Sequence, residues 1–390
     1  MKLSIEKLSR FRNRVMASFI VDDLTAVNPE DAAAFIQFSQ WVQQAGLKGE
    51  MSLIIGLRRS AEGRALPLHP DYVAERARAA SYLDAYMEIM THNLLYDFSA
   101  DRIRADGPHE GIWMHDRARP MEEYLDYFRH IAARARDLGL RPAGLTLPGC
   151  GCPACVDFYN RQRLAEHAYN LNPAALEALL AVTAEGLLAG PVCGLFVGRN
   201  PLGPADVHVL AEEGGHAVYD VPPGVPSDLF GRWDRNPAHV NPDAYVSPDG
   251  QGGRLAQLLA QHTRTVVVYG HWQSLRPDTG IGNAAFREVA ARLARFHGDE
   301  IVWMRPTEIA AYRHTERHTE LRLAADGRSF TLAIPFAPLH PLTFRVLGAK
   351  RVKIRTPAGQ LLRPDEPTVA GALFSFLPEP GRYEILTQRA

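Results

Sequence analysis

The sequence is poor in cysteine and has no excess of charge of either sign. Only four cysteines occur in 390 residues, and three of them crowd together at Cys150, Cys152 and Cys155. Such crowding is unlike the spread of cysteines in a secreted disulfide framework. Lysine and arginine number 43 against 44 aspartates and glutamates, so no overall field attracts nucleic acid or an anionic membrane. We therefore expect neither partner.

A long apolar run is also lacking. No stretch approaches the roughly 18–20 apolar residues that a transmembrane helix requires. Near the start of the chain, charges at Lys2, Glu6, Lys7 and Arg10 interrupt any segment typical of a signal peptide. We therefore predict a cytoplasmic protein, and the sequence leaves its oligomeric state open.

Shorter apolar runs alternate with amphipathic stretches, in a composition of 46% hydrophobic and 22% charged residues that is typical of globular proteins. Parallel strands buried on both faces have such runs. Repeated strand-then-helix units favour a closed β/α barrel over an open sheet. The predicted strands are Val15–Val21, Met51–Ile55, Ala85–Met90, Ala143–Leu147, Cys193–Val197, His216–Val221, Thr265–Tyr269 and Glu300–Trp303. The predicted helices are Ala32–Ala45, Tyr72–Tyr82, Met121–Leu138, Val156–His167, Pro173–Leu188, Pro204–Glu213, Leu255–His262, Ala284–Phe296 and Thr307–Tyr312.

After about His318 the pattern changes to alternation of apolar and polar residues. Period-two runs separated by glycine and proline turns are typical of antiparallel strands. They cover Glu320–Leu323, Ser329–Ile334, Arg351–Ile354 and Tyr383–Leu386. We therefore predict two domains, a β/α barrel over residues 1–317 and a small antiparallel β-sandwich over residues 318–390.

Four predicted strands end in side chains that catalysis commonly uses, and the active site of a parallel barrel lies at the carboxyl ends of its strands. Asp22 and Asp23 follow the first strand, and His92, Asp220 and His271 end or follow three others. An isolated aspartate pair more often caps a turn, but this pair follows a fully apolar strand. Because successive side chains point in opposite directions, Asp23 can bind a metal while Asp22 acts as general base.

A single histidine at a strand end is more often structural, but Asp97 stands five positions after His92 and can share a metal with it. Oxygen and imidazole ligands suit Zn, Mn, Co or Ni, so we predict a divalent metal, most readily zinc, that activates water. His271 can protonate a leaving amine, a common role of histidine. Trp272 can offer an apolar face to a sugar ring. A core histidine and a packing tryptophan are the alternatives.

The ordered motifs resemble those of the polysaccharide deacetylases. The resemblance covers roughly residues 13–315 and is carried by Phe19–Asp23, Glu88–His92, a strand ending in Pro148, Tyr219–Asp220 and a strand ending in His271. It implies that Asp22 is the base, that Asp23 and His92 bind the metal, and that His271 is the acid. Asp220 can orient a catalytic partner, and Pro148 borders the substrate.

The sequence departs from the family pattern at two places. The family's second metal-binding histidine falls at Tyr96, so the candidates for the third ligand are Asp97, His109 and His115, in that order. The arginine that precedes the proline motif is absent from Leu145–Pro148. The match is therefore better for the wider group of barrels that share this architecture.

Two further segments carry reactive side chains. Gly107–Asp116 contains His109, Glu110, His115 and Asp116, which suit a substrate lid in which Glu110 contacts the substrate, although such a segment is more often a surface loop. The thiols Cys150, Cys152 and Cys155 can bind a soft metal or cycle through a disulfide, with reduced structural thiols as the alternative.

These observations lead to one functional hypothesis and two alternatives. The hypothesis is a metal-dependent hydrolase that removes an N-acyl group from a sugar or a related small amide. The first alternative is a carbohydrate-binding or regulatory protein that kept the barrel without the reaction. The second is a thiol-metal or redox protein that uses the cysteine cluster.

Overall fold

The computed structural model describes residues 3–147, 171–196, 206–224, 240–261, 263–349, 351–369 and 371–387. It divides into two compact units, one of residues 17–307 and one that joins residues 1–16 to residues 308–390. Pro148, the cysteines Cys150, Cys152 and Cys155, and the predicted helix Val156–His167 lie outside the described residues. Among the residues that are described, no helix combines the length and the apolar character needed to cross a membrane.

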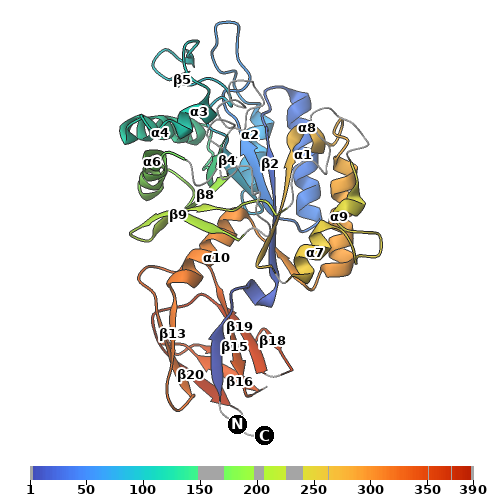
Figure 1. Ribbon diagram of the computed structural model, residues 1–390, viewed down its shortest axis with the longest axis vertical. Helices are drawn as coiled ribbons and strands as arrows, with labels where there is room; N and C mark the ends of the chain where they lie inside the picture. The colour runs from blue at the N-terminus through green and yellow to red at the C-terminus, as the bar shows by residue number, and fades with distance from the viewer. Residues whose placement is uncertain are drawn as a thin grey trace. The chain divides into compact units, whose positions relative to one another are not determined.

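The unit of residues 17–307 is built on one predominantly parallel sheet (Figure 1). From edge to edge its strands are β11 (Thr265–His271), β2 (Val15–Asp22), β3 (Gly49–Leu53), β4 (Leu83–Met87), β7 (Gly144–Thr146), β8 (Val192–Phe196), β10 (His216–Asp220) and β9 (His208–Glu213), and β12 (Ile301–Trp303) also pairs with β2. The neighbours from β2 to β10 pair in parallel. They follow one another in chain order, as the strands of a β/α barrel do.

The two sides of this sheet approach each other. Gly224, just after β10, donates its N–H to the carbonyl oxygen of Val267 in β11 at 3.0 Å. The rings of Phe196 in β8 and Tyr269 in β11 lie 4.9 Å apart. The sheet therefore curls into part of a barrel, consistent with the predicted architecture.

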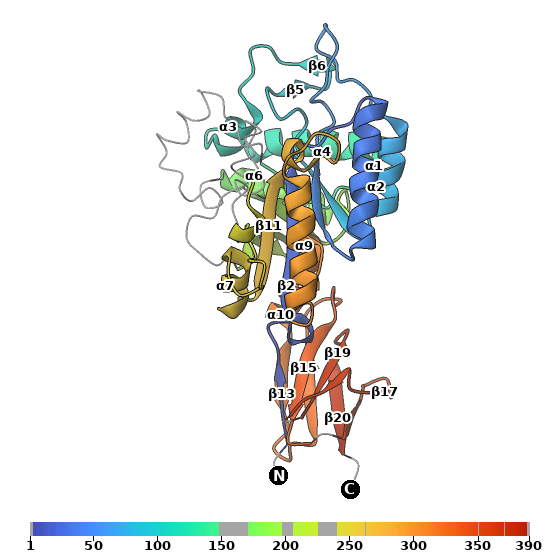
Figure 2. The ribbon, with the colours of Figure 1, turned by 90° about the vertical axis from the view of Figure 1, so that its right-hand side faces the viewer.

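Helices surround the curled sheet (Figure 2). The longer ones are α1 (Pro29–Gln44), α2 (Pro70–Ala79), α4 (Met121–Asp137), α6 (Pro173–Ala184), α7 (Arg254–Ala260) and α9 (Asn283–His297), and the shorter ones are α3 (Glu110–His115) and α8 (Trp272–Leu275). Every residue of β2 and β8 is buried, which explains their continuous apolar runs. Aromatic rings fill the space between sheet and helices. The ring centroid of Phe19 in β2 lies 6.3 Å from that of Phe38 in α1 and 5.5 Å from that of Phe286 in α9.

Two expectations about local structure are wrong. The stretch Pro204–Glu213, expected as a helix, contains strand β9, which pairs antiparallel with β10. The turn between these strands is Gly214–Gly215, with φ of 57° and 87°, and glycine is favoured where a two-residue hairpin loop requires positive φ. Residues 110–115, expected as a surface loop, form α3, where the His109 side chain accepts a hydrogen bond from the Gly111 N–H at the helix start.

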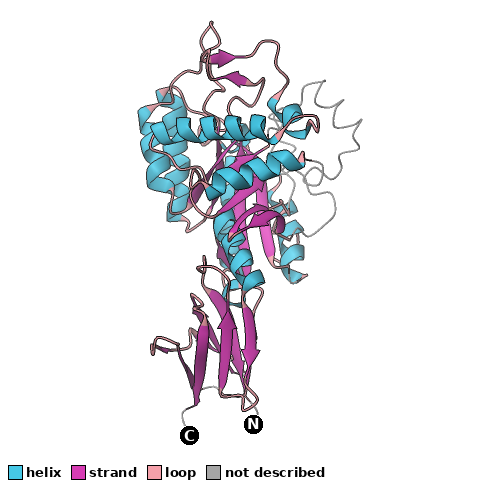
Figure 3. Ribbon diagram, turned by 90° about the vertical axis from the view of Figure 1, so that its left-hand side faces the viewer, coloured by secondary structure: helices cyan, strands magenta, loops and turns pink. Residues whose placement is uncertain are grey.

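The second unit consists mainly of two antiparallel sheets (Figure 3), together with most of helix α10 (Pro306–His318). One sheet contains β1 (Ser4–Lys7), β15 (Leu342–Leu347), β19 (Gly371–Phe376) and β18 (Glu366–Pro367). The other contains β13 (Glu320–Leu323), β14 (Ser329–Ala333), β20 (Gly381–Thr387), β16 (Val352–Arg355) and β17 (Leu361–Leu362). Rings from both sheets contact one another, with centroids 4.8–6.3 Å apart; they belong to Phe330, Phe344, Phe376 and Tyr383.

The N-terminal strand belongs to this second unit. β1 pairs with β15 in the C-terminal part of the chain, whereas the barrel was expected to cover all of residues 1–317. The division between the units also falls at residue 308 rather than 317. A four-residue strand carries no pattern that identifies its partner, which explains why the pairing was not foreseen.

Candidate active site

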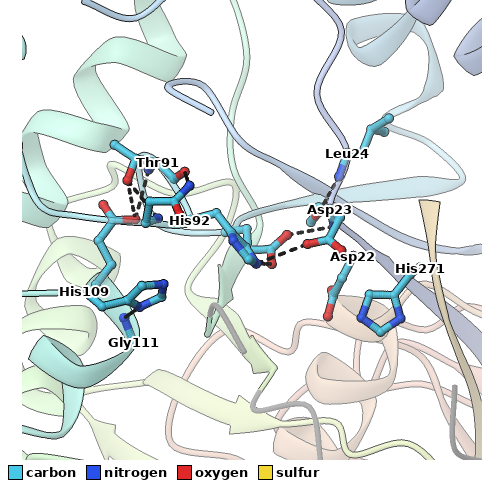
Figure 4. A network of polar contacts seen from close by, with 12 residues as sticks. Asp22, Asp23, Leu24, Thr91, His92, His109, Gly111 and His271 are labelled. Atoms are coloured by element: carbon cyan, nitrogen blue, oxygen red, sulfur yellow. Dashed lines mark hydrogen bonds and ion pairs between the residues drawn. The ribbon is translucent and has the colours of Figure 1, made fainter. Parts of the chain in front are cut away.

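Three segments far apart in the sequence meet at the carboxyl ends of the strands. Asp22 ends β2 and Asp23 follows it, Glu88–His92 forms the turn after β4, and His271 ends β11. Strands β2, β3 and β4 are parallel, so the chain leaves β2 and β4 at the same edge of the sheet. Figure 4 shows the side chains of Asp22, Asp23, His92 and His271 close together there.

Asp23, Glu88 and His92 form the centre of the cluster. His92 Nε2 lies 3.1 Å from Asp23 Oδ1 and 3.0 Å from Glu88 Oε1. The second oxygen of Glu88, Oε2, accepts a hydrogen bond from the backbone N–H of Asp23 at 2.9 Å. Gln273 Nε2 donates to Asp23 Oδ2 at 3.1 Å. Each of the three residues offers a ligand atom, and these atoms all lie within 4.8 Å of one another.

The backbone of the cluster is strained. Asp23 has a φ of 68°, His92 of 62° and Ile89 of 50°. Non-glycine residues rarely adopt this left-handed conformation, and a β-branched residue such as isoleucine does so least. Each such residue costs on the order of 1–3 kcal/mol and persists only where the surrounding structure enforces it, which happens most at functional sites.

Asp22 forms a second group with Tyr269 and His271. The Tyr269 hydroxyl donates to Asp22 Oδ2 at 2.6 Å and lies 3.3 Å from His271 Nε2. Asp22 Oδ1 is buried and has no hydrogen-bond partner among the described residues. The Tyr269 hydroxyl therefore contacts both Asp22 and His271, and one oxygen of Asp22 makes no hydrogen bond among the described residues.

The surroundings drive the pKa values of the adjacent aspartates apart. Burial, with the nearby charge of Glu88, raises the pKa of Asp22 well above its usual value, and the Tyr269 hydrogen bond offsets this only in part. Burial acts on Asp23 in the same direction, but hydrogen bonding and charge from His92, with contributions from His271 and Gln273, lower its pKa overall. Burial alone would lower the pKa of His92, yet Glu88 and Asp23 raise it to about 11.

The donor set of the Asp23 cluster fits a divalent metal. Two carboxylates and one imidazole suit Zn, Mn, Co or Ni. The side chains of Asp23, Glu88 and His92 are 6%, 1% and 13% exposed. Burying two carboxylates side by side is costly, and a bound cation would offset that cost. Asp23 and His92 were expected as ligands. Glu88 was not.

The structure does not bring Asp97 to the cluster. Asp97 lies in the short pair of β5 (Tyr96–Asp97) and β6 (Arg102–Ile103). Its Oδ1 accepts hydrogen bonds from Ser99 N, Ser99 Oγ and Ala100 N, which commits it to a local turn. Asp97, the first candidate from the sequence for a third ligand, therefore lies outside the cluster, and the third residue beside Asp23 and His92 is Glu88, four positions before His92.

His109 lies near the cluster without joining it. Its ring centroid is 6.4 Å from that of His92, and its Nδ1 accepts from Gly111 N at 3.1 Å. Burial, together with the positive charge of His92, lowers the pKa of His109 to about 4. Of the other candidates in this segment, His115 is buried in α3, and Asp116 pairs with Arg119 at 2.9 Å.

Asp220, Trp272 and Glu110 are all buried. Asp220 ends β10, and its Oδ1 has no partner in the described part of the chain; burial raises its pKa to about 7. Among the described residues, no hydrogen bond or ion pair joins Asp220 to the Asp23 cluster. Trp272 is 5% exposed and packs edge-on against Phe38, so it offers no open face to a sugar. Glu110 is 0% exposed, which places it behind the site rather than against a substrate.

Sequence reasoning missed Glu88, Tyr269 and Gln273 as site residues. Glu88 lies inside the Glu88–His92 motif, where a glutamate among apolar residues was the available signal. Tyr269 ends a predicted strand two positions before His271, and residues two apart in a strand point to the same side. That periodicity would have placed Tyr269 beside His271. No comparable signal marks Gln273.

A groove is lined by other segments of the same unit. It has a volume of about 1370 Å³, above the roughly 300–1,000 Å³ of typical small-molecule pockets. Residues 59–63, 94–106 and 119–130 contribute most of its lining, including Tyr127, and the three residues of the Asp23 cluster do not line it.

Comparisons with known proteins find distant structural likeness only. No protein family model matches the chain. No curated protein matches it. Among solved structures, it is similar to 4-α-glucanotransferase from Thermococcus litoralis, with 13% identity and a TM-score of 0.43, over 77% of this chain and 40% of that chain. It is also similar to a protein from Mycobacterium smegmatis assigned as a polysaccharide deacetylase, with 15% identity and a TM-score of 0.36, over 78% of this chain and 92% of that one. The chain thus spans less than half the length of the glucanotransferase.

Proposed function

We propose that this protein is a metal-dependent hydrolase that removes an N-acyl group from a sugar or a related small amide. The observation that carries the proposal is the meeting of Asp23, Glu88 and His92, with ligand atoms within 4.8 Å of one another, beside Asp22 and His271 (Figure 4). Amide hydrolysis needs an activated water, stabilisation of the developing oxyanion and a proton for the departing amine. The cluster contains groups suited to each of these tasks.

Asp23, Glu88 and His92 would hold the metal. A divalent ion bound there supplies Lewis acidity toward a carbonyl oxygen and lowers the pKa of water. Binding requires His92 to be neutral, so the proton that Asp23 and Glu88 hold on the imidazole must leave. Gln273 fixes the second oxygen of Asp23 through its 3.1 Å hydrogen bond, which restrains the orientation of that carboxylate.

Asp22 serves as the general base and His271 as the general acid. A base works best when its pKa lies close to the working pH, and burial moves the pKa of Asp22 in that direction. Tyr269 donates to one oxygen of Asp22 and leaves the other to accept a proton. His271 Nε2 lies 3.3 Å from the same Tyr269 hydroxyl, so one phenol contacts both the proposed base and the proposed acid.

The test compares metal content and amide hydrolysis in two carboxamide variants. Glu88→Gln removes one of the proposed ligands, whereas Asp97→Asn removes the ligand expected from the sequence but not found in the cluster. The purified proteins are loaded with Zn²⁺, desalted and analysed for bound metal, and acetate release is measured with N-acetylglucosamine and its dimer as probes.

We expect Glu88→Gln to weaken Zn²⁺ binding by more than the roughly 10–100-fold caused by loss of a ligand's outer hydrogen-bond partner, and to abolish acetate release. Asp97→Asn should retain both. The proposal is wrong if the unmodified protein binds no divalent ion, or if Asp97→Asn loses the ion and Glu88→Gln keeps it. An ion retained without hydrolysis of any amide would favour the carbohydrate-binding alternative.

A further inference from the structure

The turn that carries Glu88 and His92 is held from outside by another carboxylate. The backbone N–H groups of Met90 and Thr91 donate to Glu110 Oε1 and Oε2 at 3.2 and 3.0 Å. The hydroxyl of Thr91 lies 3.2 Å from the same Oε2. Glu110 thus bonds to the two residues between Ile89 and His92, in the middle of the turn.

Glu110 is itself anchored by Tyr127. Glu110 is the first residue of α3 and is fully buried. The Tyr127 hydroxyl, from α4, donates to Glu110 Oε1 at 2.5 Å and accepts a hydrogen bond from the Tyr96 N–H at 2.9 Å. A buried carboxylate is costly unless its oxygens are hydrogen-bonded, and here both oxygens have donors. The cost of burying Glu110 is therefore offset only while this arrangement holds.

The turn needs such support because it is strained at both ends. Ile89 and His92 have positive φ, of 50° and 62°, and flank the two residues that Glu110 binds. Conformations of this kind persist only where neighbouring groups enforce them. Without Glu110 the turn would relax, and His92 Nε2 would lose its place 3.0 Å from Glu88 and 3.1 Å from Asp23.

We propose that Glu110 is a positioning residue of the candidate metal centre and that Tyr127 holds it in place. Glu110 makes no hydrogen bond or ion pair with Asp23, Glu88 or His92 and acts through the backbone of Met90 and Thr91. Tyr127 also lines the groove described above, so the same side chain forms part of the groove wall and supports the turn through Glu110. The reference to a metal rests on the proposed function, whereas the positioning of the turn does not.

The first experiment measures the turn itself in metal-free protein. Hydrogen exchange of the amides of residues 88–92 is compared in the unmodified protein, Glu110→Gln and Tyr127→Phe. The control is Tyr124→Phe, which removes a buried hydroxyl from the same helix. That hydroxyl donates to the Trp113 carbonyl at 2.8 Å and makes no contact with Glu110.

We expect the amides of Met90 and Thr91 to exchange at least about tenfold faster in Glu110→Gln, because a glutamine presents an amide N–H₂ where one oxygen accepted and leaves a buried donor without its partner. Tyr127→Phe should change exchange in the same direction by a smaller factor, and Tyr124→Phe should leave these two amides unchanged. If Glu110→Gln does not fold, Tyr127→Phe decides the question.

The second experiment measures Zn²⁺ affinity by competition with a chromophoric chelator. We expect affinity to fall about 10–100-fold in Glu110→Gln, as for loss of other groups that orient metal ligands, with a smaller fall in Tyr127→Phe and none in Tyr124→Phe. Unchanged exchange in both Glu110→Gln and Tyr127→Phe overturns the positioning role, whatever the metal data. Faster exchange in a protein that binds no Zn²⁺ at all supports the positioning role and refutes the proposed function instead.

Discussion

Asp22 and Asp23 are neighbours in the sequence, but the contacts they make differ in kind. Asp22 receives one hydrogen bond from a phenol, whereas Asp23 contacts an imidazole and a carboxamide. The pKa of the first is raised and that of the second is lowered. When the pKa values of two neighbouring carboxyl groups are driven apart, one of them commonly accepts a proton during catalysis while the other stays charged.

This division leads to a prediction about the two carboxamide variants. Asp22→Asn should lower kcat by about 10²–10⁴-fold, the usual contribution of a general base, and keep the metal. Asp23→Asn should lose the metal and the activity together. Metal analysis and steady-state kinetics on the same preparations separate the two effects. Equal metal loss in both variants would argue against separate roles.

Asp220 gives a prediction about stability and pH. Burial raises its pKa to about 7 in the folded protein, above the roughly 3.9 of an unperturbed aspartate. Because the folded state holds the proton more tightly, the stability contributed by protonated Asp220 is complete below about pH 4 and is lost as pH rises toward 7. The loss is on the order of 2–4 kcal/mol for a fully buried group.

Urea unfolding at pH 5 and pH 8 measures this loss. The free energy of unfolding of the unmodified protein should fall, relative to that of Asp220→Asn, between the two pH values. Asp299→Asn, at an exposed position after α9, should follow the unmodified protein at both. The same pH dependence in Asp220→Asn and the unmodified protein would show that Asp220 titrates as an ordinary exposed aspartate.

At the scale of elements, most helices and strands could be predicted because their periodicity is determined locally. The apolar run Val15–Val21 is strand β2, and the 3.6-residue pattern of Met121–Leu138 is helix α4. Strand β9 was mistaken for a helix because Leu210–Glu213 consists of good helix formers, and the alternation of Val207 and Val209 and the Gly214–Gly215 hairpin signal were passed over.

The contact between α1 and the sheet gives a prediction at this scale. Phe38 is fully buried. Its ring centroid lies 6.3 Å from that of Phe19, 5.7 Å from that of Trp272 and 6.2 Å from that of Phe286. Phe38→Ala should lower the free energy of unfolding by about 3–5 kcal/mol, the usual cost of a large core cavity. Gln37→Ala, at the exposed neighbouring position, should change it by less than about 0.5 kcal/mol. Chemical denaturation measures both, and similar values would contradict the packing described.

At the scale of the whole molecule, the sheet brings distant segments together. Asp23 and His92 are separated by two strand-and-helix units, yet β2, β3 and β4 are adjacent and parallel. Strand β11 is the neighbour of β2 on its other side, and this adjacency adds His271. The N-terminal strand β1, in contrast, pairs with β15 in the unit that joins residues 1–16 to residues 308–390. The two strands are more than 300 residues apart in the sequence, so no local pattern predicts their pairing.

The sequence by itself determined most of the strands and helices, and which strands end near Asp22, Asp23, His92 and His271, because burial and periodicity act on neighbouring residues. Only the tertiary structure decided that Glu88 rather than Asp97 stands beside His92. The position of Glu88 depends on the turn after β4, in which Ile89 and His92 have positive φ, and on the Glu110 carboxylate that supports this turn. Because Glu110 lies twenty positions after Met90, no local sequence pattern reveals the contact.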